Sequence, residues 1–303
     1  EDLLISIEEP TVDISGELMK QVDLVLATGG SGMVKAAYSS GTPAYGVGPG
    51  NAVQIVAEDA NPADAAKKII ASKAFDYATS CSSENSVIIH ESLYDDMIKE
   101  FESLNCYFVK GEERVTLENH MWKINRKGYK GLNPGIVAQS AVKIAEDAGL
   151  TVPKTTRVLL VEGADDIEAD YYSKEKLSPV LTVFKYNTFE EGYKKLVRLT
   201  DNNGTGHSCG IHTNNQEYVN HLGMYMKSSR IVVNQPQAAA NGGAFFNGMP
   251  STVSLGCGTW GGNVTTENIS FKHFLNVTWV SELLEVNRPT DEDIFGNYFR
   301  KFM

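Results

Sequence analysis

Short apolar runs alternate with segments of helical periodicity over most of this 303-residue chain. The runs at 23–28 (DLVLAT), 86–90 (SVIIH), 157–161 (RVLLV) and 180–186 (VLTVFKY) have the length and the Val, Ile and Leu content of buried strands. Helical segments follow several of them, an order that is typical of α/β folds with a parallel sheet. The sequence therefore predicts an α/β architecture, long enough for one large domain or two ordinary ones.

Residues that start helices support this pattern. Asn61 and Pro62 are suited to the N-cap and the first position of a helix. Thr188 and Glu191 have the spacing of a capping box, which predicts a helix from there to residue 199. We also expect helices at 33–38, 91–103 and 139–148, and strands around 43–50, at 53–56 and at 231–234.

Charge and cysteine content exclude several classes of protein. The formal net charge is −11, which disfavours nucleic acid or a membrane surface as a partner because both attract basic patches. No run approaches the roughly 18 apolar residues of a spanning helix. The scattered cysteines are Cys81, Cys106, Cys209 and Cys257. They form no Cys-x-x-Cys pair, so neither a metal site nor a disulfide framework is expected, and a reducing cytoplasm suits them.

A glycine-rich turn, Thr28-Gly29-Gly30-Ser31-Gly32, stands between a predicted strand and a predicted helix. Backbone N–H groups and the positive end of the helix dipole would suit an anion there, such as a dinucleotide pyrophosphate. The alternative is a tight turn without a ligand, and the turn alone does not decide between them.

A second candidate is the loop 78–85 (ATSCSSEN), in which small polar residues surround Cys81. A thiol in a polar loop with backbone donors can act as a nucleophile. The alternative is a buried cysteine that behaves as a small hydrophobe, which the neighbouring serines and threonine disfavour.

Two further stretches carry ionisable groups next to predicted strands. His207, within GTGHS, could act as a base or a polarising donor, although nothing local separates it from His212 or His221. Glu175, within EKLSP, could accept hydrogen bonds from a ribose. The alternatives are a hydrogen-bonded histidine without a catalytic role and an exposed charge before a strand.

In this order and spacing, the four stretches resemble the aldehyde dehydrogenase superfamily. ATGGSGMV looks like its phosphate-side turn, the Cys81 loop like its nucleophile loop, and EKLSP like its Glu-x-Phe-Gly-Pro motif. The resemblance implies a nicotinamide cofactor, NAD or NADP, and assigns its binding to Thr28, Gly29, Gly30, Glu175 and Pro179. It also implies Cys81 and His207 as the catalytic residues, and no metal.

Within that superfamily the chain looks most like the CoA-acylating branch, over nearly its whole length. The stretches that carry this likeness are LATGGSGMVKAAYSSGTPAYGVGPGN, NGTGHSCGIHTNNQ and LGCGTWGGN. The fold implied is a Rossmann-type cofactor domain, of which 1–54 would be the remainder, and an α/β catalytic thiol domain at 55–262. Residues 263–303 would form a C-terminal tail for oligomerisation, as a dimer or tetramer. An N-terminal segment of the cofactor domain would be missing from this chain.

One departure from the hydrolytic members concerns the water-activating base. Those enzymes have Glu-Leu-Gly-Gly-Lys where this chain has Val47-Gly48-Pro49-Gly50-Asn51. Because valine cannot take a proton, a thioester on Cys81 should hydrolyse slowly and await a better nucleophile, such as the thiol of coenzyme A.

The sequence favours one aldehyde substrate and leaves others as alternatives. TSCSSENS and QPQAAANGGAFFNGMP look more like the sulfoacetaldehyde enzymes, and a polar wall at 241–247 would suit a small anionic head group. Acetaldehyde and succinate semialdehyde are the alternatives, and a non-catalytic structural subunit is the alternative of another class. Cys257 is interpreted as part of the wall. A basic cluster consists of Arg126, Lys127 and Lys130. It could bind the phosphates of CoA, or it could be an ordinary solvent-exposed surface.

Overall fold

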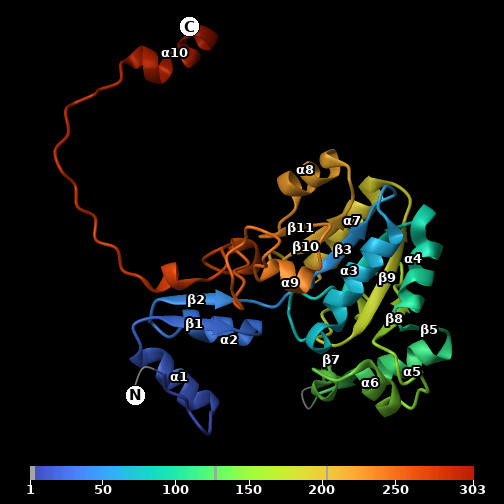
Figure 1. Ribbon diagram of the computed structural model, residues 1–303. Coiled ribbons are helices and arrows are strands. Elements are labelled where there is room, and N and C mark those ends of the chain that lie inside the picture. The colour runs from blue at the N-terminus through green and yellow to red at the C-terminus, as the bar shows by residue number, and fades with distance from the viewer. Residues whose placement is uncertain (1–3, 126–127, 203) are drawn as a thin grey trace. The chain divides into compact units, whose positions relative to one another are not determined.

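The computed structural model describes residues 4–125, 128–202 and 204–303, in two compact units divided between Ser270 and Phe271. The first unit has the α/β architecture that the sequence predicts (Figure 1). Its main feature is a parallel sheet of seven strands, in the order β11-β10-β3-β4-β9-β8-β5. The strands are β3 Val53–Val56, β4 Ser86–His90, β5 Cys106–Val109, β8 Val158–Glu162, β9 Val180–Tyr186, β10 Cys209–His212 and β11 Ile231–Val233.

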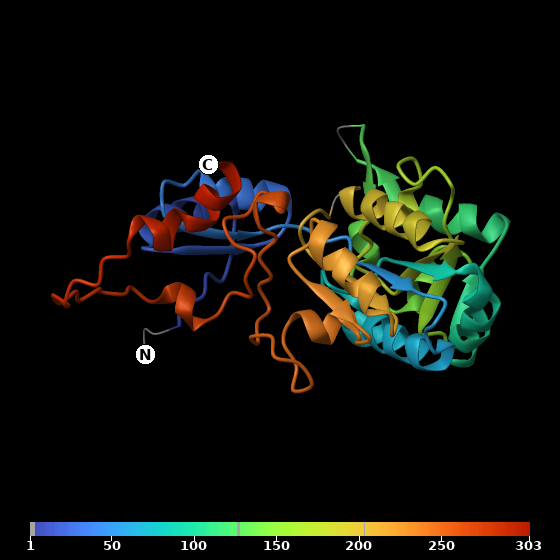
Figure 2. The same ribbon diagram turned by 90° about the horizontal axis from the view of Figure 1, so that it is seen from above.

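Helices cover both faces of this sheet (Figure 2). On β4, Val87 and Ile89 pack against α3 and α4, whereas Ile88 between them packs against α7 and α8. Successive strand residues point to opposite faces, so a strand covered on both sides is apolar throughout. The covering helices are α3 Pro62–Ala74, α4 Glu91–Ser103, α7 Phe189–Asp201 and α8 Gln216–Tyr225.

A smaller layer lies beside β5 and β8. Leu117 and Met121 of α5 and Ile144 of α6 pack with Val109 and Leu159 in one buried cluster. An antiparallel hairpin follows α5 and contributes Trp122 to that cluster. The elements are α5 Glu112–Met121, β6 Trp122–Ile124, β7 Lys130–Leu132 and α6 Ala141–Asp147.

The N-terminal part of the first unit has its own two-stranded parallel sheet. Val25 of β1 pairs with Ala44 of β2, and a small cluster of buried apolar side chains covers the pair. The elements are α1 Val12–Gln21, β1 Val25–Thr28, α2 Ser31–Tyr38 and β2 Ala44–Val47. The next strand, β3, already belongs to the large sheet, and the domain boundary at residue 54 stays a prediction.

Local start signals account well for several elements. The helix predicted at 91–103 and the strand predicted at 180–186 are confirmed as α4 and β9. Asn61 accepts a hydrogen bond from Asp64 N at 3.0 Å, with Pro62 as the first helical residue, as predicted. Several elements were not predicted from the sequence, among them α1, α5, β5, β10, α8 and the short α9 Gln237–Asn241.

The predicted capping box at the start of α7 forms only in part. Thr188 Oγ1 accepts from Glu191 N at 3.3 Å, as the motif requires. The reciprocal bond differs, because Glu191 Oε2 accepts from Asn187 N at 3.0 Å and not from the backbone of Thr188. The carboxylate therefore satisfies the backbone donor one residue earlier than expected.

The second unit, 271–303, begins with a short 3-10 helix and ends with α10 Asp291–Phe302. Thr290 and Asp293 form a complete capping box at the start of α10. Many large apolar side chains of this second unit are exposed, among them Trp279, Leu283 and Phe295. No helix within the described ranges of either unit is both long and apolar enough to cross a membrane.

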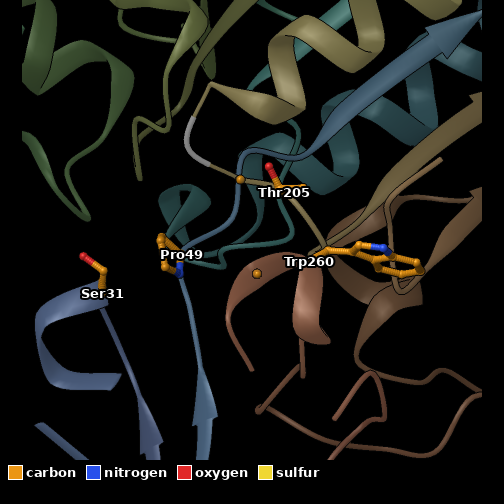
Figure 3. A pocket seen from close by; sticks show the side chains of 6 residues that line it. Ser31, Pro49, Thr205 and Trp260 are labelled. Carbon is orange, nitrogen blue, oxygen red and sulfur yellow. The ribbon is translucent and has the colours of Figure 1, made fainter. Parts of the chain in front are cut away.

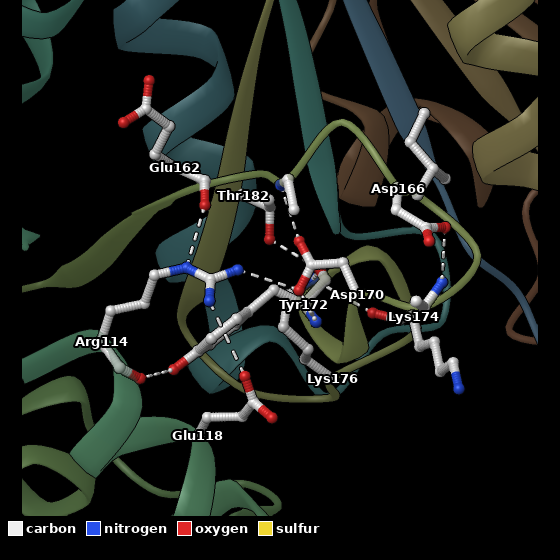
Figure 4. A network of polar contacts seen from close by, with 12 residues as sticks. Arg114, Glu118, Glu162, Asp166, Asp170, Tyr172, Lys174, Lys176 and Thr182 are labelled. Carbon is white, nitrogen blue, oxygen red and sulfur yellow. Dashed lines mark hydrogen bonds and ion pairs between the residues drawn. The ribbon is translucent and has the colours of Figure 1, made fainter. Parts of the chain in front are cut away.

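A buried polar network holds the segment between β8 and β9 (Figure 4). Arg114 Nη2 donates to Asp170 Oδ1 at 3.0 Å, and Asp170 also accepts from the backbone N–H groups of Ala164 and Tyr172. The Tyr172 carbonyl accepts from Lys176 Nζ at 2.6 Å. This network supports the backbone on both sides of residue 175, from α5 to the start of β9.

Replacement of Asp170 by alanine should destabilise the first unit by about 3 kcal/mol, because it leaves a partly buried guanidinium and two amides without their acceptor. The free energy of urea-induced unfolding measures this. Glu168→Ala, which removes an exposed partner of Arg198, is the control and should unfold near the wild-type midpoint. Equal unfolding curves for Asp170→Ala and wild type would contradict the role given to the network.

Candidate functional site

Three of the four candidate stretches, and the segment that contains Gly50, each lie directly before a strand of the large sheet. Residues 48–51 precede β3, 79–85 precede β4, 175–179 precede β9 and 204–208 precede β10. These strands are consecutive neighbours, in the order β10-β3-β4-β9. Parallel strands run in one direction, so the segments that precede them meet at one edge of the sheet. This amino-terminal edge holds the candidate site.

A strained turn leads into the Cys81 loop. Asp76, Tyr77 and Ala78 have φ angles of 47°, 48° and 57°, in the left-handed region. Side-chain and backbone bonds from Thr79 to Asp76 stabilise the turn. Left-handed backbone costs roughly 1–2 kcal/mol per non-glycine residue, and such strain gathers at functional sites. This turn was not predicted from the sequence.

Cys81 and His207 are brought together across 126 residues of sequence. Cys81 Sγ lies 3.0 Å from His207 Nε2, and His207 Nδ1 lies 2.9 Å from Ser208 Oγ. If the thiol donates to Nε2, the ring proton is on Nδ1 and is donated to Ser208. The structure thereby distinguishes His207 from the two other histidines. His212 lies at the end of β10, and His221 lies on α8, where it packs against Phe189.

Burial keeps both members of this pair neutral. Burial raises the pKa of the Cys81 thiol to about 12, with Glu175 and Cys257 raising it further and the backbone N–H of Cys81 and Arg230 lowering it. Burial and then the charge of Arg230 lower the pKa of His207 to about 3. In this state Cys81 is a hydrogen-bonded thiol beside a neutral imidazole, and its thiolate forms only where nearby groups stabilise the negative charge.

Gly50 lies against this pair more closely than any side chain would permit. A Cβ atom on Gly50 would stand 2.6 Å from the Cys81 carbonyl oxygen and 2.9 Å from the His207 ring. Its N–H donates to Glu175 Oε1 at 3.4 Å. Glycine is therefore required at residue 50 by this close approach, which links three of the four segments.

Glu175 is a mostly buried carboxyl in the same group. Burial raises its pKa to about 7, while the Gly50 N–H, Lys73 and Lys176 act in the opposite direction. A carboxyl with a pKa near neutrality can hold or release a proton under physiological conditions. Pro179, in contrast, lies at the start of β9, where its carbonyl accepts from Leu159 N.

The predicted phosphate turn joins β1 to α2, and its role in binding phosphate stays a prediction. Gly29 follows β1, and Gly30 is the N-cap of α2 without a side-chain cap, which leaves the helix start open to an anion. Thr28 Oγ1 lies 3.0 Å from Ser254 Oγ, so its side chain is engaged with the glycine-rich C-terminal part of the first unit. A cavity of about 670 Å³ with mostly apolar walls lies between α1 and α2, lined by Val12, Met19, Met33 and Ala36 among others.

A second cavity, of about 240 Å³, lies at the start of α2 (Figure 3). Ser31 and Pro49 line one part of it, and Thr205, Trp260 and Gly261 line another. Pro49 is adjacent to Gly50 and Thr205 is close in sequence to His207. The cavity is therefore lined both by the predicted phosphate turn and by residues of the segments that precede β3 and β10.

Other predicted residues are engaged elsewhere. Lys130 pairs with Glu118 at 2.8 Å, while Arg126 and Lys127 lie outside the described residues. The amide groups of Asn241 and Asn247 donate to neighbouring groups of their own segment. No group of side chains in the described ranges has the composition of a metal site.

Three residues contact the Cys81–His207 pair in ways that were not predicted from the sequence: Gly50, Ser208 and Arg230. Arg230 is the residue before β11, and its guanidinium donates to the His207 carbonyl at 2.9 Å. The only sequence signal was an arginine directly before an apolar strand (RIVVN). Cys257, interpreted as wall, is buried, and its N–H donates to Asn263 Oδ1 at 2.9 Å.

Comparison with known families matches residues 9–109 to the aldehyde dehydrogenase family. The chain is 67% identical over 300 residues to the sulfoacetaldehyde dehydrogenase of an Acholeplasma species, a match that covers 99% of the chain and 62% of that protein. It is 56% identical over 302 residues to the acylating sulfoacetaldehyde dehydrogenase of Bilophila wadsworthia, with 100% and 65% covered. The chain thus spans less than two thirds of these relatives.

Among solved structures, the chain is similar to an acetylating aldehyde dehydrogenase from Geobacillus thermoglucosidasius. The TM-score is 0.84 at 36% sequence identity, and the match covers 92% of this chain and 62% of the other. The predicted fold class, an α/β fold of aldehyde dehydrogenase type, is confirmed by this similarity.

Gly50→Ala should disrupt the Cys81–His207 pair, because the added methyl group overlaps the Cys81 carbonyl and the imidazole. We expect the rate of Cys81 alkylation by iodoacetamide, followed by peptide mass spectrometry, to change at least about fivefold, as expected when the pair moves apart. Gly223→Ala is the control, since nothing lies within 4 Å of the added atom. An unchanged alkylation rate in Gly50→Ala would show that the close approach is not needed.

The pH dependence of the same alkylation reports the state of the thiol. Because the pKa of Cys81 is raised to about 12, the thiolate fraction should grow about tenfold per pH unit from neutral to about pH 9 in the protein without ligands. No plateau is expected in that range. A plateau below about pH 8 would mean that the thiol is already activated before any ligand binds.

Proposed function

Because the chain belongs to the aldehyde dehydrogenase family, we propose that the full-length protein is a CoA-acylating aldehyde dehydrogenase whose Cys81 carries the acyl group. The observation that supports this best is the 3.0 Å contact between Cys81 and His207, beneath Gly50 and beside Glu175. An isolated structural thiol would need none of these neighbours.

The substrate that we favour is sulfoacetaldehyde, with sulfoacetyl-CoA as product. The two relatives with 67% and 56% identity are named for this aldehyde, and one of them is named acylating. Acetaldehyde and succinate semialdehyde are the alternatives, and a structural neighbour is named acetylating. A non-catalytic structural subunit is disfavoured by the intact arrangement of Cys81, His207 and Glu175.

The residues present fit a nicotinamide dinucleotide, NAD or NADP. The open start of α2 after Gly29 and Gly30 suits a pyrophosphate, and the apolar cavity between α1 and α2 suits a flat ring. We assign the hydrogen bonds from a ribose to Glu175, and further contacts with the dinucleotide to Thr28, the hydroxyl of which lies beside that of Ser254, and to Pro179, directly before β9. When bound, the cofactor supplies the hydride acceptor for aldehyde oxidation.

Cys81 supplies the covalent chemistry. Its thiolate adds to the aldehyde carbonyl carbon and forms a thiohemiacetal, whose oxyanion needs donors such as the backbone N–H groups of the loop. Oxidation by loss of hydride converts this adduct into a thioester on Cys81. The sulfur of coenzyme A then attacks the thioester carbonyl, acyl-CoA leaves, and the Cys81 sulfur is released. One proton is lost overall for each aldehyde oxidised.

His207 orients this chemistry and does not serve as a strong base. Because its pKa is lowered to about 3, the ring is neutral and offers Nε2 as an acceptor for the S–H group of Cys81. It can also accept a hydrogen bond from the thiol of coenzyme A and so orient that thiol during exchange. Glu175, with a pKa near 7, is better matched to accept a proton at neutral pH.

The segment after β2 explains why a thiol would be the acceptor. Val47 is buried, with 1% of its surface exposed, and it has no group that could activate water. Three residues further on, Gly50 lies against the Cys81 carbonyl and the His207 ring. A thioester on Cys81 should therefore persist until coenzyme A attacks it, and thioester exchange makes the overall reaction reversible.

Cellular and assembly properties complete the proposal. We place the enzyme in the cytoplasm, with neither nucleic acid nor membrane as a partner, and as a dimer or tetramer. The exposed apolar side chains of 271–303 support an oligomerisation role for this tail, within the proposed tail of 263–303. Residues 1–54 are proposed as the remainder of the cofactor domain and 55–262 as the thiol domain.

Cys81→Ala in the full-length protein should lower CoA-dependent cofactor reduction by at least about 10³-fold, since the covalent intermediate cannot form. Absorbance of the reduced cofactor is followed with sulfoacetaldehyde and with acetaldehyde, each with and without coenzyme A. Cys209→Ala is the control, because that thiol is buried in β10. Residual activity near wild type in Cys81→Ala would refute the proposal.

A further inference from the structure

Arg230 is a buried arginine at the same edge of the sheet as the site. It precedes β11, the neighbour of β10, just as His207 precedes β10. Only 4% of its surface is exposed. We propose that Arg230 is a positioning residue for Cys81 and His207, and that its uncompensated positive charge favours the thiolate of Cys81. The identification of Cys81 as nucleophile rests on the proposed function.

The guanidinium of Arg230 joins two separate segments of the chain. Nη1 donates to the His207 carbonyl at 2.9 Å, and Nη2 donates to the Gly256 carbonyl at 2.8 Å. Nε donates to Asn268 Oδ1 at 2.8 Å. The longer contacts of Nη2 reach the carbonyls of Thr266 and Glu267, at 3.3 and 3.4 Å. Arg230 therefore fixes the backbone of His207 against the glycine-rich segment that contains Cys257.

All of these acceptors are neutral amide or carbonyl oxygens. Within the ranges that the structure describes, Arg230 forms no ion pair with a carboxylate, unlike Arg114 with Asp170 or Arg198 with Glu168. A buried arginine is normally paired, because an unpaired charge is costly to remove from water. The hydrogen bonds satisfy its donors, but the positive charge remains in the site.

That charge acts on both members of the pair. It is among the influences that lower the pKa of Cys81, and after burial it is the other cause of the low pKa of His207. In return, the thiols of Cys257 and Cys81 raise the pKa of Arg230, although burial lowers it overall. A permanent cation here opposes an imidazolium at His207 and favours negative charge on sulfur.

Other groups act on Cys81 in the opposite direction. Glu175 and the Cys257 thiol both raise its pKa. Loss of the arginine charge should therefore leave the backbone N–H of Cys81 as the remaining group that favours the thiolate. It would also raise the pKa of His207, but the difference between about 3 and about 12 is too large for a proton to move from Cys81 to the ring. The expected net effect is less thiolate.

Three variants of the full-length protein separate charge from hydrogen bonding. Arg230→Gln keeps two N–H donors and removes the charge, whereas Arg230→Lys keeps the charge and loses the planar fork. Arg198→Gln is the matched control, because it removes an arginine that pairs with exposed Glu168. The measurement is the rate of Cys81 alkylation by iodoacetamide at about pH 8, followed on the Cys81 peptide by mass spectrometry.

We expect Arg230→Gln to lower this rate about three- to tenfold, since one unit in pKa means tenfold less thiolate, partly offset by greater intrinsic reactivity. Arg230→Lys should stay within about twofold of wild type in alkylation, yet lose kcat with little change in the KM for coenzyme A, because the His207 backbone is held less precisely. Arg198→Gln should match wild type in both.

Two results would overturn the inference. One is an alkylation rate in Arg230→Gln equal to that of the wild type, which would leave Arg230 as a structural clamp only. The other is an equal loss in Arg230→Lys, which would show that packing and not charge matters, and this variant decides the matter even if Arg230→Gln fails to fold. Alkylation needs no turnover, so a protein without CoA-dependent activity would refute the proposed function and still test Arg230.

Discussion

The hydrogen bond between Cys81 and His207 depends on the parallel sheet, and much of the site depends on that hydrogen bond. The two residues are 126 positions apart, and they meet because their segments precede strands separated only by β3. Gly50 precedes β3 itself and lies against both of them. In many open α/β sheets the ligand lies at the carboxyl ends of the strands. Here Cys81, the proposed nucleophile, lies at the opposite edge, whereas the proposed phosphate turn follows the carboxyl end of β1.

Desolvation is the second constraint on this site. Burial keeps Cys81 as a thiol and His207 as a neutral ring, and it brings Glu175 close to neutrality. An uncharged thiol is less reactive towards oxidants than a thiolate, and nearby positive charge favours the thiolate. Arg230 provides such charge permanently in our account.

The sequence was sufficient to predict the elements whose signals are local. Apolar runs of β-branched residues predicted β4 and β9, and the Asn61-Pro62 pair predicted the start of α3, because each depends on neighbouring residues only. The four candidate segments could be found for the same reason, and family resemblance supplied their roles. Those roles for Cys81, His207 and Glu175 stay proposals.

What the sequence could not predict depends on distant contacts. Gly50 matters because the Cys81 carbonyl and the His207 ring lie against it, and neither is near it in the chain. Arg230 looked like an ordinary charge before a strand until its carbonyl partners were known. The left-handed turn at 76–78 contains no glycine, so its sequence does not indicate positive φ angles. Strand β10, the sequence of which is CGIH, is short and buried by its neighbours, so its own residues give little signal.

The most direct test of the central claim is to trap the acyl group on the full-length enzyme. The protein would be mixed with sulfoacetaldehyde and oxidised cofactor in the absence of coenzyme A, and its peptides analysed by mass spectrometry. Our account predicts about one equivalent of reduced cofactor per site, an acyl adduct on Cys81, and its loss as acyl-CoA when coenzyme A is added. Continued turnover to the free acid, or an adduct on another residue with Cys81 unmodified, would contradict it.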